Sequence, residues 1–159
     1  MYKIGIGYDS HKIDKNEKLF LGGVNINCSF GLKGHSDADV LIHAVIDALL
    51  GACSLPDIGK LFPDTDEEFK DISSLNLLER VKKKITKDFN IINIDSVIIA
   101  EVPKIAPYSE KMKQNIADVL EIETNNINIK AKSNEGMGFI GRKEGIASIV
   151  NALVREKKC

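Results

Sequence analysis

Tryptophan is absent from the 159-residue sequence, and aromatic residues make up only 6% of it. Net charge is also low, because 22 Lys and Arg are matched by 23 Asp and Glu for a formal charge of -1. Nucleic acids are bound through basic surfaces and aromatic stacking, so this composition argues against a nucleic-acid binder. No apolar run approaches the ~18–20 residues that span a bilayer, and the chain starts like a strand rather than a signal peptide, so no membrane partner is expected.

The sequence has only three cysteines. Cys28, Cys53 and Cys159 are odd in number, far apart and show no C-x-x-C spacing. Neither a disulfide framework nor a cysteine zinc site is expected, and a reducing intracellular compartment fits this usage. Cys53 follows an apolar segment, so it is interpreted as a small buried side chain rather than a nucleophile. The length suits one ordinary hydrophobic core, and a single domain over residues 1–159 is expected.

Hydrophobic periodicity predicts both strands and helices. Residues 3–8 alternate as a strand, and Gly22-Gly23 suits a tight hairpin between short strands at 18–21 and 24–26. Ser36 is a good N-cap for a helix over residues 37–50. The later elements predicted by apolar spacing are a helix opened by Ser73 or Ser74, a strand at 94–102, a helix at 109–120, a strand at 127–132 and a helix at 142–156. Each helix has one apolar face, so the fold class expected is α/β, an α+β two-layer sandwich with helices mainly on one side of a sheet.

All three histidines of the chain fall within one short stretch. Residues two apart on a strand share a face, so Asp9 and His11 at a strand end present two ligands together, and a helical His43 completes an open zinc site. Asp39 and Asp47 lie four residues before and after His43, and we expect one of them to accept the proton of the imidazole nitrogen that does not bind metal. The alternative is that His43 is a hydrogen-bonded core residue on an apolar helix.

Residues 136–141 spell G-x-G-x-x-G between a predicted strand and a predicted helix. A dinucleotide-binding fold needs a further strand with an acidic residue about 20 positions later, which does not follow here, so that fold is not expected. A glycine-rich turn at a helix start leaves backbone N–H groups free for an anion, with Ser133, Asn134, Arg142 and Lys143 around it. The alternative is that the glycines serve only the turn.

Two polar segments are rich in turn residues. Residues 57–66 carry three carboxylates and a lysine around Gly and Pro, and residues 103–107 form a basic bracket between two prolines. A calcium-loop interpretation of the first segment fails, because Phe69 stands where glycine is required and Leu75 where the bidentate glutamate belongs. A substrate loop is the hypothesis for residues 57–66, with an ordinary surface connection as the alternative.

Five blocks of the sequence, in this order and at this spacing, resemble the 2-C-methyl-D-erythritol 2,4-cyclodiphosphate synthase family. They are Asp9-x-His11 and residues 35–43, 57–66, 100–106 and 135–142, and the resemblance covers nearly the whole chain. It implies a mixed four-stranded β-sheet with helices packed on one face plus a small β-hairpin. It also implies a phosphorus-oxygen lyase of the non-mevalonate isoprenoid pathway, which cyclises 4-diphosphocytidyl-2-C-methyl-D-erythritol 2-phosphate and releases CMP. The substrate's own 2-phosphate attacks its diphosphate, so no protein nucleophile is needed.

The same resemblance implies two metals. Asp9, His11 and His43 would hold Zn²⁺ or a similar divalent cation, and Glu135 would help to hold Mg²⁺ or Mn²⁺ between the substrate phosphates. The catalytic positions that it implies are His35, Ser133 and Glu135. The substrate-binding positions that it implies are Asp9, His11, His35, Ser36, Asp57, Ile58, Gly59, Phe62, Pro63, Asp64, Thr65, Asp66, Ala100, Pro103, Lys104, Ile105, Ala106, Lys132, Ser133, Asn134, Glu135, Phe139 and Arg142. Many members carry a threonine run before the glutamate, so the roles of Lys132 and Asn134 are not carried over, whereas Ser133 keeps a hydroxyl.

For partners, the resemblance implies a homotrimer with active sites between subunits, and a central cavity at Phe139 and Arg142 able to hold an isoprenoid diphosphate. The expected location is the cytoplasm of a bacterium, or the plastid stroma for a processed eukaryotic chain. Two other classes of protein could use the same metal-binding residues. A zinc-dependent phosphohydrolase of a nucleotide-linked substrate would activate water at the metal, and a noncatalytic metal- or nucleotide-binding module would have no turnover.

Overall fold

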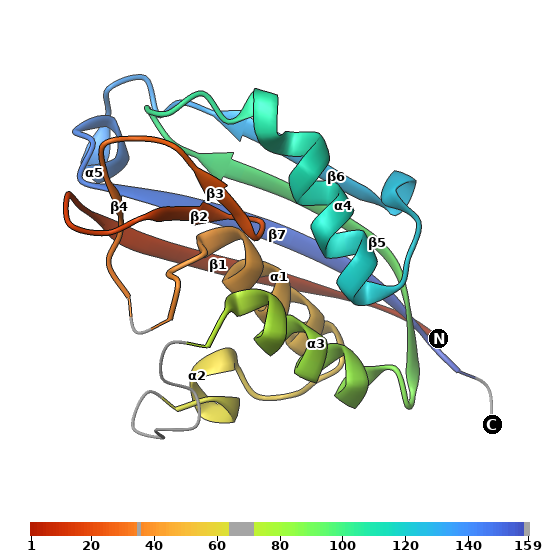
Figure 1. Cartoon of the computed structure of the whole chain (residues 1–159). Coiled ribbons are helices and arrows are strands. Elements are labelled where there is room, and N and C mark those ends of the chain that lie inside the picture. The colour runs from red at the N-terminus through yellow and green to blue at the C-terminus, as the bar shows by residue number, and fades with distance from the viewer. Residues whose placement is uncertain (35, 64–71, 158–159) are drawn as a thin grey trace.

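The computed structural model describes residues 1–34, 36–63 and 72–157. A mixed sheet of five strands, in the order β4-β1-β7-β5-β6, is its main element (Figure 1). The bounds are β1 Tyr2–Asp14, β4 Gly31–Leu32, β5 Phe89–Ile99, β6 Ile127–Lys132 and β7 Gly145–Glu156. β1 runs antiparallel to β4 and β7, β7 runs antiparallel to β5, and β5 runs parallel to β6.

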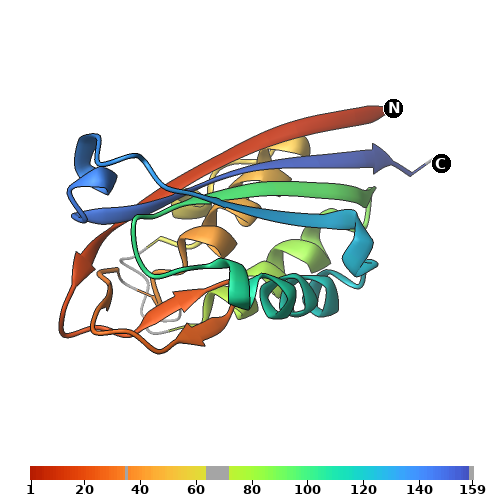
Figure 2. The same cartoon turned by 90° about the horizontal axis from the view of Figure 1, so that it is seen from above.

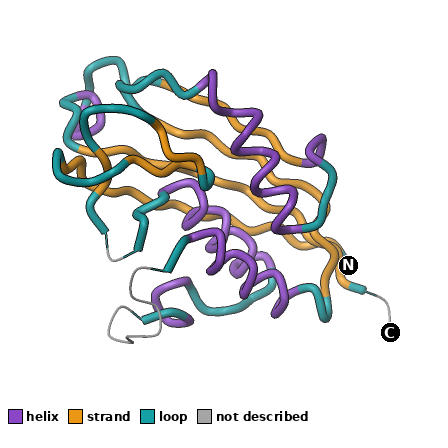
Figure 3. Tube along the Cα trace, in the orientation of Figure 1, coloured by secondary structure: helices purple, strands orange, loops and turns teal. Residues whose placement is uncertain are grey.

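The helices cover one face of this sheet and leave the other open, as Figure 2 shows. The long helices are α1 Val40–Ala52, α3 Ser74–Ile85 and α4 Ser109–Leu120, and the short ones are α2 Ile58–Leu61, α5 Gly138–Gly141 and the 3₁₀ turns Ala106–Tyr108 and Thr124–Asn126. Strands β2 Leu19–Leu21 and β3 Val24–Ile26 form a separate hairpin (Figure 3). The predicted fold class is therefore confirmed. Among the described residues, no helix has both the length and the apolar character needed to cross a membrane.

Helix α1 lies unusually close to β1, because two glycines face it. A Cβ built on Gly5 would stand 2.1 Å from the carbonyl oxygen of Ala48, and one on Gly7 would stand 1.9 Å from that of Ala44. Any larger residue would push the strand and the helix apart, since such contacts are far inside van der Waals distance. The next inward-facing positions of β1 after Gly7 are Asp9 and His11, so this close packing also sets their distance from α1.

The predicted helix over residues 142–156 is wrong, because this segment is the central strand β7, which pairs with β1 on one side and β5 on the other. The sheet consequently has five strands, counting the two-residue β4, rather than four. Ile146, Val150 and Val154 are buried against the helices, whereas Ile149 and Leu153 lie on the open face. A strand that is apolar on both faces does not alternate, and its spacing can imitate a helical stripe.

The other differences concern element ends. Helix α1 begins at Val40 with Asp39 as its N-cap, not at residue 37 with Ser36 as cap. Strand β5 begins at Phe89 and ends at Ile99, a shift toward the N-terminus from the predicted 94–102. The N-cap of α3 is Ser73, and the bounds of α4 and β6 are those predicted. Gly22 and Gly23 have positive φ angles of 56° and 70°, as the predicted hairpin turn requires.

Candidate active site

Three ligand-type atoms converge where β1 passes the first turn of α1. Oδ2 of Asp9 lies 3.0 Å from Nε2 of His11 and 3.0 Å from Nδ1 of His43, and the two nitrogens are 3.3 Å apart. Tetrahedral zinc with ligand distances of ~2.0–2.1 Å separates neighbouring ligand atoms by about 3.3 Å. The three atoms therefore fit three corners of a tetrahedron and leave the fourth corner open, as predicted from the sequence.

Hydrogen bonds on the far side of each imidazole assign the tautomer that a metal needs. Nδ1 of His11 lies 2.8 Å from the carbonyl oxygen of Lys33, which can only accept, so Nδ1 carries the proton and Nε2 keeps its lone pair. Nε2 of His43 lies 2.8 Å from Oγ of Ser74, and that hydroxyl donates to Asp37. Ser74 thus accepts from Nε2 of His43, which leaves Nδ1 free to bind a cation.

The prediction that Asp39 or Asp47 accepts the proton of the His43 imidazole is therefore wrong. The acceptor is the Ser74 hydroxyl, which itself donates a hydrogen bond to Asp37. Asp39 is fully buried and caps α1, and its carboxylate also accepts from the N–H groups of Gly22 and Gly23 at 2.9 and 2.7 Å. The Asp47 carboxylate accepts from the N–H of Ile58 at 2.8 Å. Ser74 lies in the next long helix and is fully buried, so no local spacing indicates it.

Electrostatics at the cluster favour an anionic Asp9. Burial raises the pKa of Asp9, but hydrogen bonds and charge from His11 and His43 outweigh burial and hold the pKa well below its usual range. Burial lowers the pKa of His11, and the hydrogen bond to Asp9 outweighs it, so the net shift is upward. A carboxylate held anionic 3.0 Å from a nitrogen of each imidazole also attracts a divalent cation in the same place. His43 is therefore not an isolated core histidine.

A cavity of about 240 Å³ lies between β1 and the second half of α1, and its lining reaches Tyr8, next to Asp9 in the chain, and Asp47, one helical turn after His43. Its lining includes the residues Ile6, Gly7, Tyr8, Asp47, Gly51, Leu55 and Asp57. Asp57 caps the short helix α2 and accepts from the N–H of Lys60 at 2.9 Å, while Asp47 holds Ile58. Gly59 lies within α2, and Phe62 and Pro63 follow it. The predicted residues His35, Asp64, Thr65 and Asp66 lie outside the described residues.

A second group of predicted residues meets at the ends of β5 and β6. Ile99 pairs with Lys132, and the N–H of Ala100 donates to the carbonyl of Lys132 at 2.9 Å, so the two following segments begin side by side. The first segment contains the predicted Pro103, Lys104, Ile105 and Ala106, and the second contains Ser133, Asn134 and Glu135. The Ser133 hydroxyl donates to Oε1 of Glu135 at 2.8 Å.

Glu101, which lies in the predicted block 100–106 but had no individual role predicted for it, joins these two segments. Its Oε1 accepts from the N–H of Asn134 at 2.8 Å and from the N–H of Gly136 at 3.3 Å. The N–H of Gly136 is therefore engaged within the protein, and the anion-site hypothesis stays a prediction for the other N–H groups of the glycine-rich turn. Glu135 has a left-handed φ of 49°, a conformation that costs a non-glycine residue ~1–2 kcal/mol.

Phe139 and Arg142 lie on or directly after α5. Phe139 is 40% exposed, and Nε of Arg142 lies 2.8 Å from Oε1 of Glu144. Among the described residues, no hydrogen bond or ion pair connects the Glu135 turn with the Asp9–His11–His43 cluster. The structure therefore assembles the metal-type cluster at one place and the residues after β5 and β6 at another.

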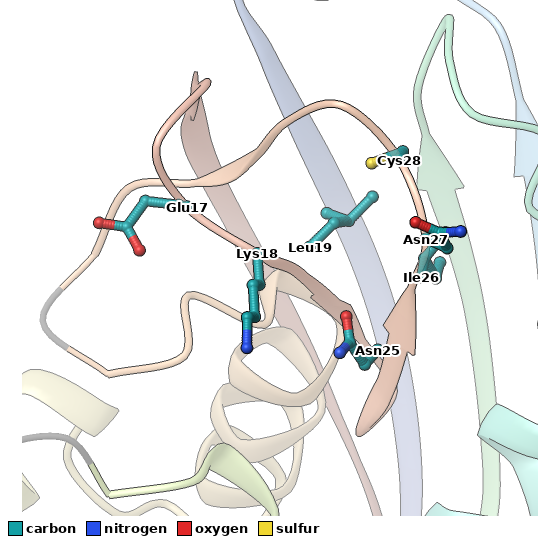
Figure 4. Close-up of a pocket in the computed structure, with 7 residues that line it drawn as sticks. All are labelled: Glu17, Lys18, Leu19, Asn25, Ile26, Asn27 and Cys28. Carbon is teal, nitrogen blue, oxygen red and sulfur yellow. The ribbon is translucent and has the colours of Figure 1, made fainter.

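A further hollow of about 280 Å³ lies at the β2–β3 hairpin (Figure 4). Its lining comprises Glu17, Lys18, Leu19, Asn25, Ile26, Asn27 and Cys28. No predicted site residue is among them. The cavity lined by Tyr8 and Asp47 is the smaller of these two, but it contains the predicted residue Asp57 and lies on the same strand and helix as the metal-type cluster, so we assign it to the site.

Comparison with known proteins agrees with this geometry. Residues 2–155 match the YgbB family. A 2-C-methyl-D-erythritol 2,4-cyclodiphosphate synthase of Clostridium botulinum is 60% identical over 147 residues, which are 92% of this chain and 94% of that protein. A solved structure of the Plasmodium falciparum protein IspF, in complex with CDP, is 38% identical with a TM-score of 0.86, and the match covers 99% of this chain and 97% of that one.

A longer relative contains the same fold. The bifunctional IspDF from Campylobacter jejuni is 42% identical with a TM-score of 0.95; the match covers 99% of this chain but only 43% of that protein. The family match spans residues 2–155, and the C. botulinum relative is similar over 92% of this chain. The chain belongs to the YgbB family, the family of the 2-C-methyl-D-erythritol 2,4-cyclodiphosphate synthases.

Proposed function

We propose that this chain is a phosphorus-oxygen lyase that cyclises 4-diphosphocytidyl-2-C-methyl-D-erythritol 2-phosphate to 2-C-methyl-D-erythritol 2,4-cyclodiphosphate and releases CMP, in the non-mevalonate isoprenoid pathway. The observation that carries the proposal is the open three-ligand cluster of Asp9, His11 and His43 beside a cavity, in a chain of this family. The substrate supplies its own nucleophile, a phosphate oxygen. The protein has to fold the substrate and to neutralise the charge that builds up at phosphorus.

For the first metal, we assign Asp9, His11 and His43 as ligands of Zn²⁺ or a similar divalent cation. The donor set fits zinc: one carboxylate, two imidazoles with free lone pairs, and edges near 3 Å. When bound, the ion would act as a Lewis acid on a phosphate oxygen at the open position. The Ser36 hydroxyl lies 3.2 Å from Nε2 of His43, the nitrogen that faces away from the metal position, so the substrate contact that we propose for Ser36 rests on the family and not on this distance.

The cavity beside the metal cluster is assigned to the methylerythritol phosphate part of the substrate. Asp57 lines it, and a carboxylate is a good acceptor for sugar hydroxyls. Ile58, Gly59, Phe62 and Pro63 belong to the same segment, and we propose that Asp64, Thr65, Asp66 and His35 complete this side, His35 with a catalytic role.

For the second metal, we assign Glu135 as the protein ligand of Mg²⁺ or Mn²⁺. Magnesium sites commonly use only one or two carboxylates together with substrate phosphates, so a single exposed carboxylate at a turn fits this use. The Ser133 hydroxyl, which is exposed beside it, is assigned a catalytic role in contact with the phosphates. Residues 100–106, with Lys132 and Asn134, are assigned to frame the cytidine and its phosphates.

A homotrimer with active sites between subunits is the proposed assembly. The open face of the sheet exposes apolar side chains that a monomer would leave in water: Ile4 is 72%, Ile6 69% and Tyr8 54% exposed. Their neighbours on β7 are Leu153 opposite Ile4 and Ile149 opposite Tyr8, so the apolar surface extends onto a second strand, where the exposed Asn151 opposite Ile6 interrupts it. Such a patch is typical of a subunit interface. We further propose that Phe139 and Arg142 line a central cavity able to bind an isoprenoid diphosphate.

We also propose that the chain is a single domain and that it is located in the cytoplasm. One continuous core joins the helices to the sheet, which supports a single synthase domain over residues 1–159. Bacterial relatives such as the C. botulinum enzyme support a cytoplasmic location rather than a plastid stroma.

A product assay tests the activity. Purified protein with zinc and Mg²⁺ is expected to convert the substrate to CMP and the cyclic diphosphate in equal amounts. CMP with an uncyclised phosphate would instead assign a zinc-dependent phosphohydrolase. His43→Ala is expected to lose zinc and to lower the rate by several orders of magnitude, whereas a noncatalytic binding module would have no rate to lose.

A further inference from the structure

The turn that carries Glu135 is closed by a carboxylate from a different segment. Glu101 follows β5, whereas the two N–H groups that it accepts, those of Asn134 and Gly136, follow β6. One oxygen, Oε1, receives both hydrogen bonds. Glu101 is half-buried, so water competes weakly for this oxygen, while the side chain of Glu135 is exposed.

The backbone of the turn explains why an acceptor is needed at this place. Glu135 and Gly136 have consecutive positive φ angles of 49° and 74°. Backbone N–H groups in such turns point toward one side and form a concavity that attracts anions. Here the acceptor is an oxygen of the chain itself, Oε1 of Glu101, and its two hydrogen bonds stabilise a backbone conformation that a non-glycine residue such as Glu135 rarely adopts.

We propose that Glu101 is a positioning residue: its carboxylate oxygen holds the Asn134–Gly136 turn so that Glu135 presents its carboxylate to Mg²⁺ or Mn²⁺. This inference rests on the proposed role of Glu135. The Ser133 hydroxyl orients Oε1 of Glu135 at 2.8 Å, so the side chain and the backbone of the ligand are each held by a separate contact. Because both partners of Glu101 are backbone N–H groups, the role requires an acceptor atom in this position and not a charge.

The test is Mn²⁺ binding to the zinc-loaded protein in the presence of CDP, followed by electron paramagnetic resonance. Glu101→Ala is expected to weaken Mn²⁺ binding by about 10-fold or more, the effect typical of residues that orient a metal ligand. Zinc content, measured by mass spectrometry, is expected to stay at the level of the unmodified protein. Glu101→Gln keeps an oxygen acceptor and is expected to retain Mn²⁺ affinity within about twofold.

Two further variants make the test specific. Glu101→Met, which keeps the length of the side chain without an oxygen, carries the same expectation as Glu101→Ala and replaces it if the alanine variant does not fold. Glu110→Ala removes an exposed carboxylate on α4 that pairs with Lys113, and it is expected to leave Mn²⁺ affinity unchanged.

The possible outcomes distinguish a failure of the Glu101 inference from a failure of the proposed role of Glu135. Unchanged Mn²⁺ affinity in folded Glu101→Ala and Glu101→Met overturns the positioning role. A loss in Glu101→Gln equal to that in Glu101→Ala also overturns it, because charge would then be what matters. If Glu135→Gln keeps full Mn²⁺ affinity, the proposed second-metal ligand itself is wrong. Loss in Glu135→Gln together with no loss in Glu101→Ala refutes only the role of Glu101.

Discussion

Gly7→Ala should disrupt the proposed zinc site without changing any of the residues that we assign as its ligands. A Cβ at this position would stand 1.9 Å from the carbonyl oxygen of Ala44 and 2.7 Å from the nitrogen of Ala48, both of them helix backbone. Ordinary contact begins near 3.4 Å, so β1 and α1 would have to separate by about 1.5 Å. Asp9 and His11 would move with the strand and His43 with the helix. Zinc coordination tolerates only about 0.2 Å, so the cluster would lose its geometry.

The cost to stability follows from the same contact. Overpacking a tight interior typically costs ~1–3 kcal/mol, and backbone-to-backbone clashes belong at the upper end of that range. For a chain of this size, ~3 kcal/mol lowers the melting temperature by roughly 6–12 °C. Zinc content by mass spectrometry and melting by circular dichroism measure the two effects, with zinc determined at a temperature where the variant is folded.

Gly51→Ala is the matched control for this interface. Gly51 lies on α1 and also faces β1. A Cβ added to Gly51 would stand 3.8 Å from its nearest neighbour, the carbonyl oxygen of Ile6, which is an ordinary contact. Alanine in a helix is favoured over glycine by up to ~1 kcal/mol, so unchanged or slightly raised stability and full zinc content are expected. A Gly7→Ala protein that melts like Gly51→Ala and retains zinc would refute the reasoning.

Three other predictions follow from separate contacts. Ser74→Ala removes the acceptor for Nε2 of His43, and zinc affinity measured by chelator competition should fall about 10–100-fold; unchanged affinity would mean that Ser74 does not orient the imidazole. Ile6→Asp places a charge in the proposed subunit interface and should convert the trimer to monomer in sedimentation measurements, whereas exposed Lys83→Asp on α3 should not. Burial raises the pKa of the Cys53 thiol to about 11, so its alkylation should be slow at pH 8 and accelerate as pH rises toward 11; rapid reaction of folded protein at pH 8 would contradict this. The same shift destabilises the fold at high pH, because above the pKa of an unfolded thiol, ~8.5, the unfolded chain loses its proton first.

Metal-type residues were easier to predict than the residues that orient them. The Asp9-x-His11 spacing determines that two side chains share one face of a strand, whatever the rest of the fold. Ser74 and Asp37 are different, because the contact between them depends on where α3 starts relative to α1. Glu101 depends likewise on β5 and β6 being neighbours, which parallel pairing across a long connection does not reveal in the sequence.

The choice of which face of β1 is buried also depends on the tertiary structure. The alternation of β1 predicts a strand but does not say which of its two faces is buried. The structure buries Gly5 and Gly7 and leaves the apolar side chains of Ile4, Ile6 and Tyr8 on the open face. Alternation specifies that two faces differ, but only the helix that packs against the sheet decides which face is inside.

The sequence by itself therefore determined the α/β class, the order of most elements, the three zinc-type ligands and the family, because these depend on local periodicity and on residue types at short spacing. Only the tertiary structure decided that residues 145–156 form the central strand, that Ser74 and Asp37 support His43, and that Glu101 closes the Glu135 turn. The physical reason is that hydrogen bonds and packing between distant segments act only once the chain has brought those segments together, and no local pattern records them.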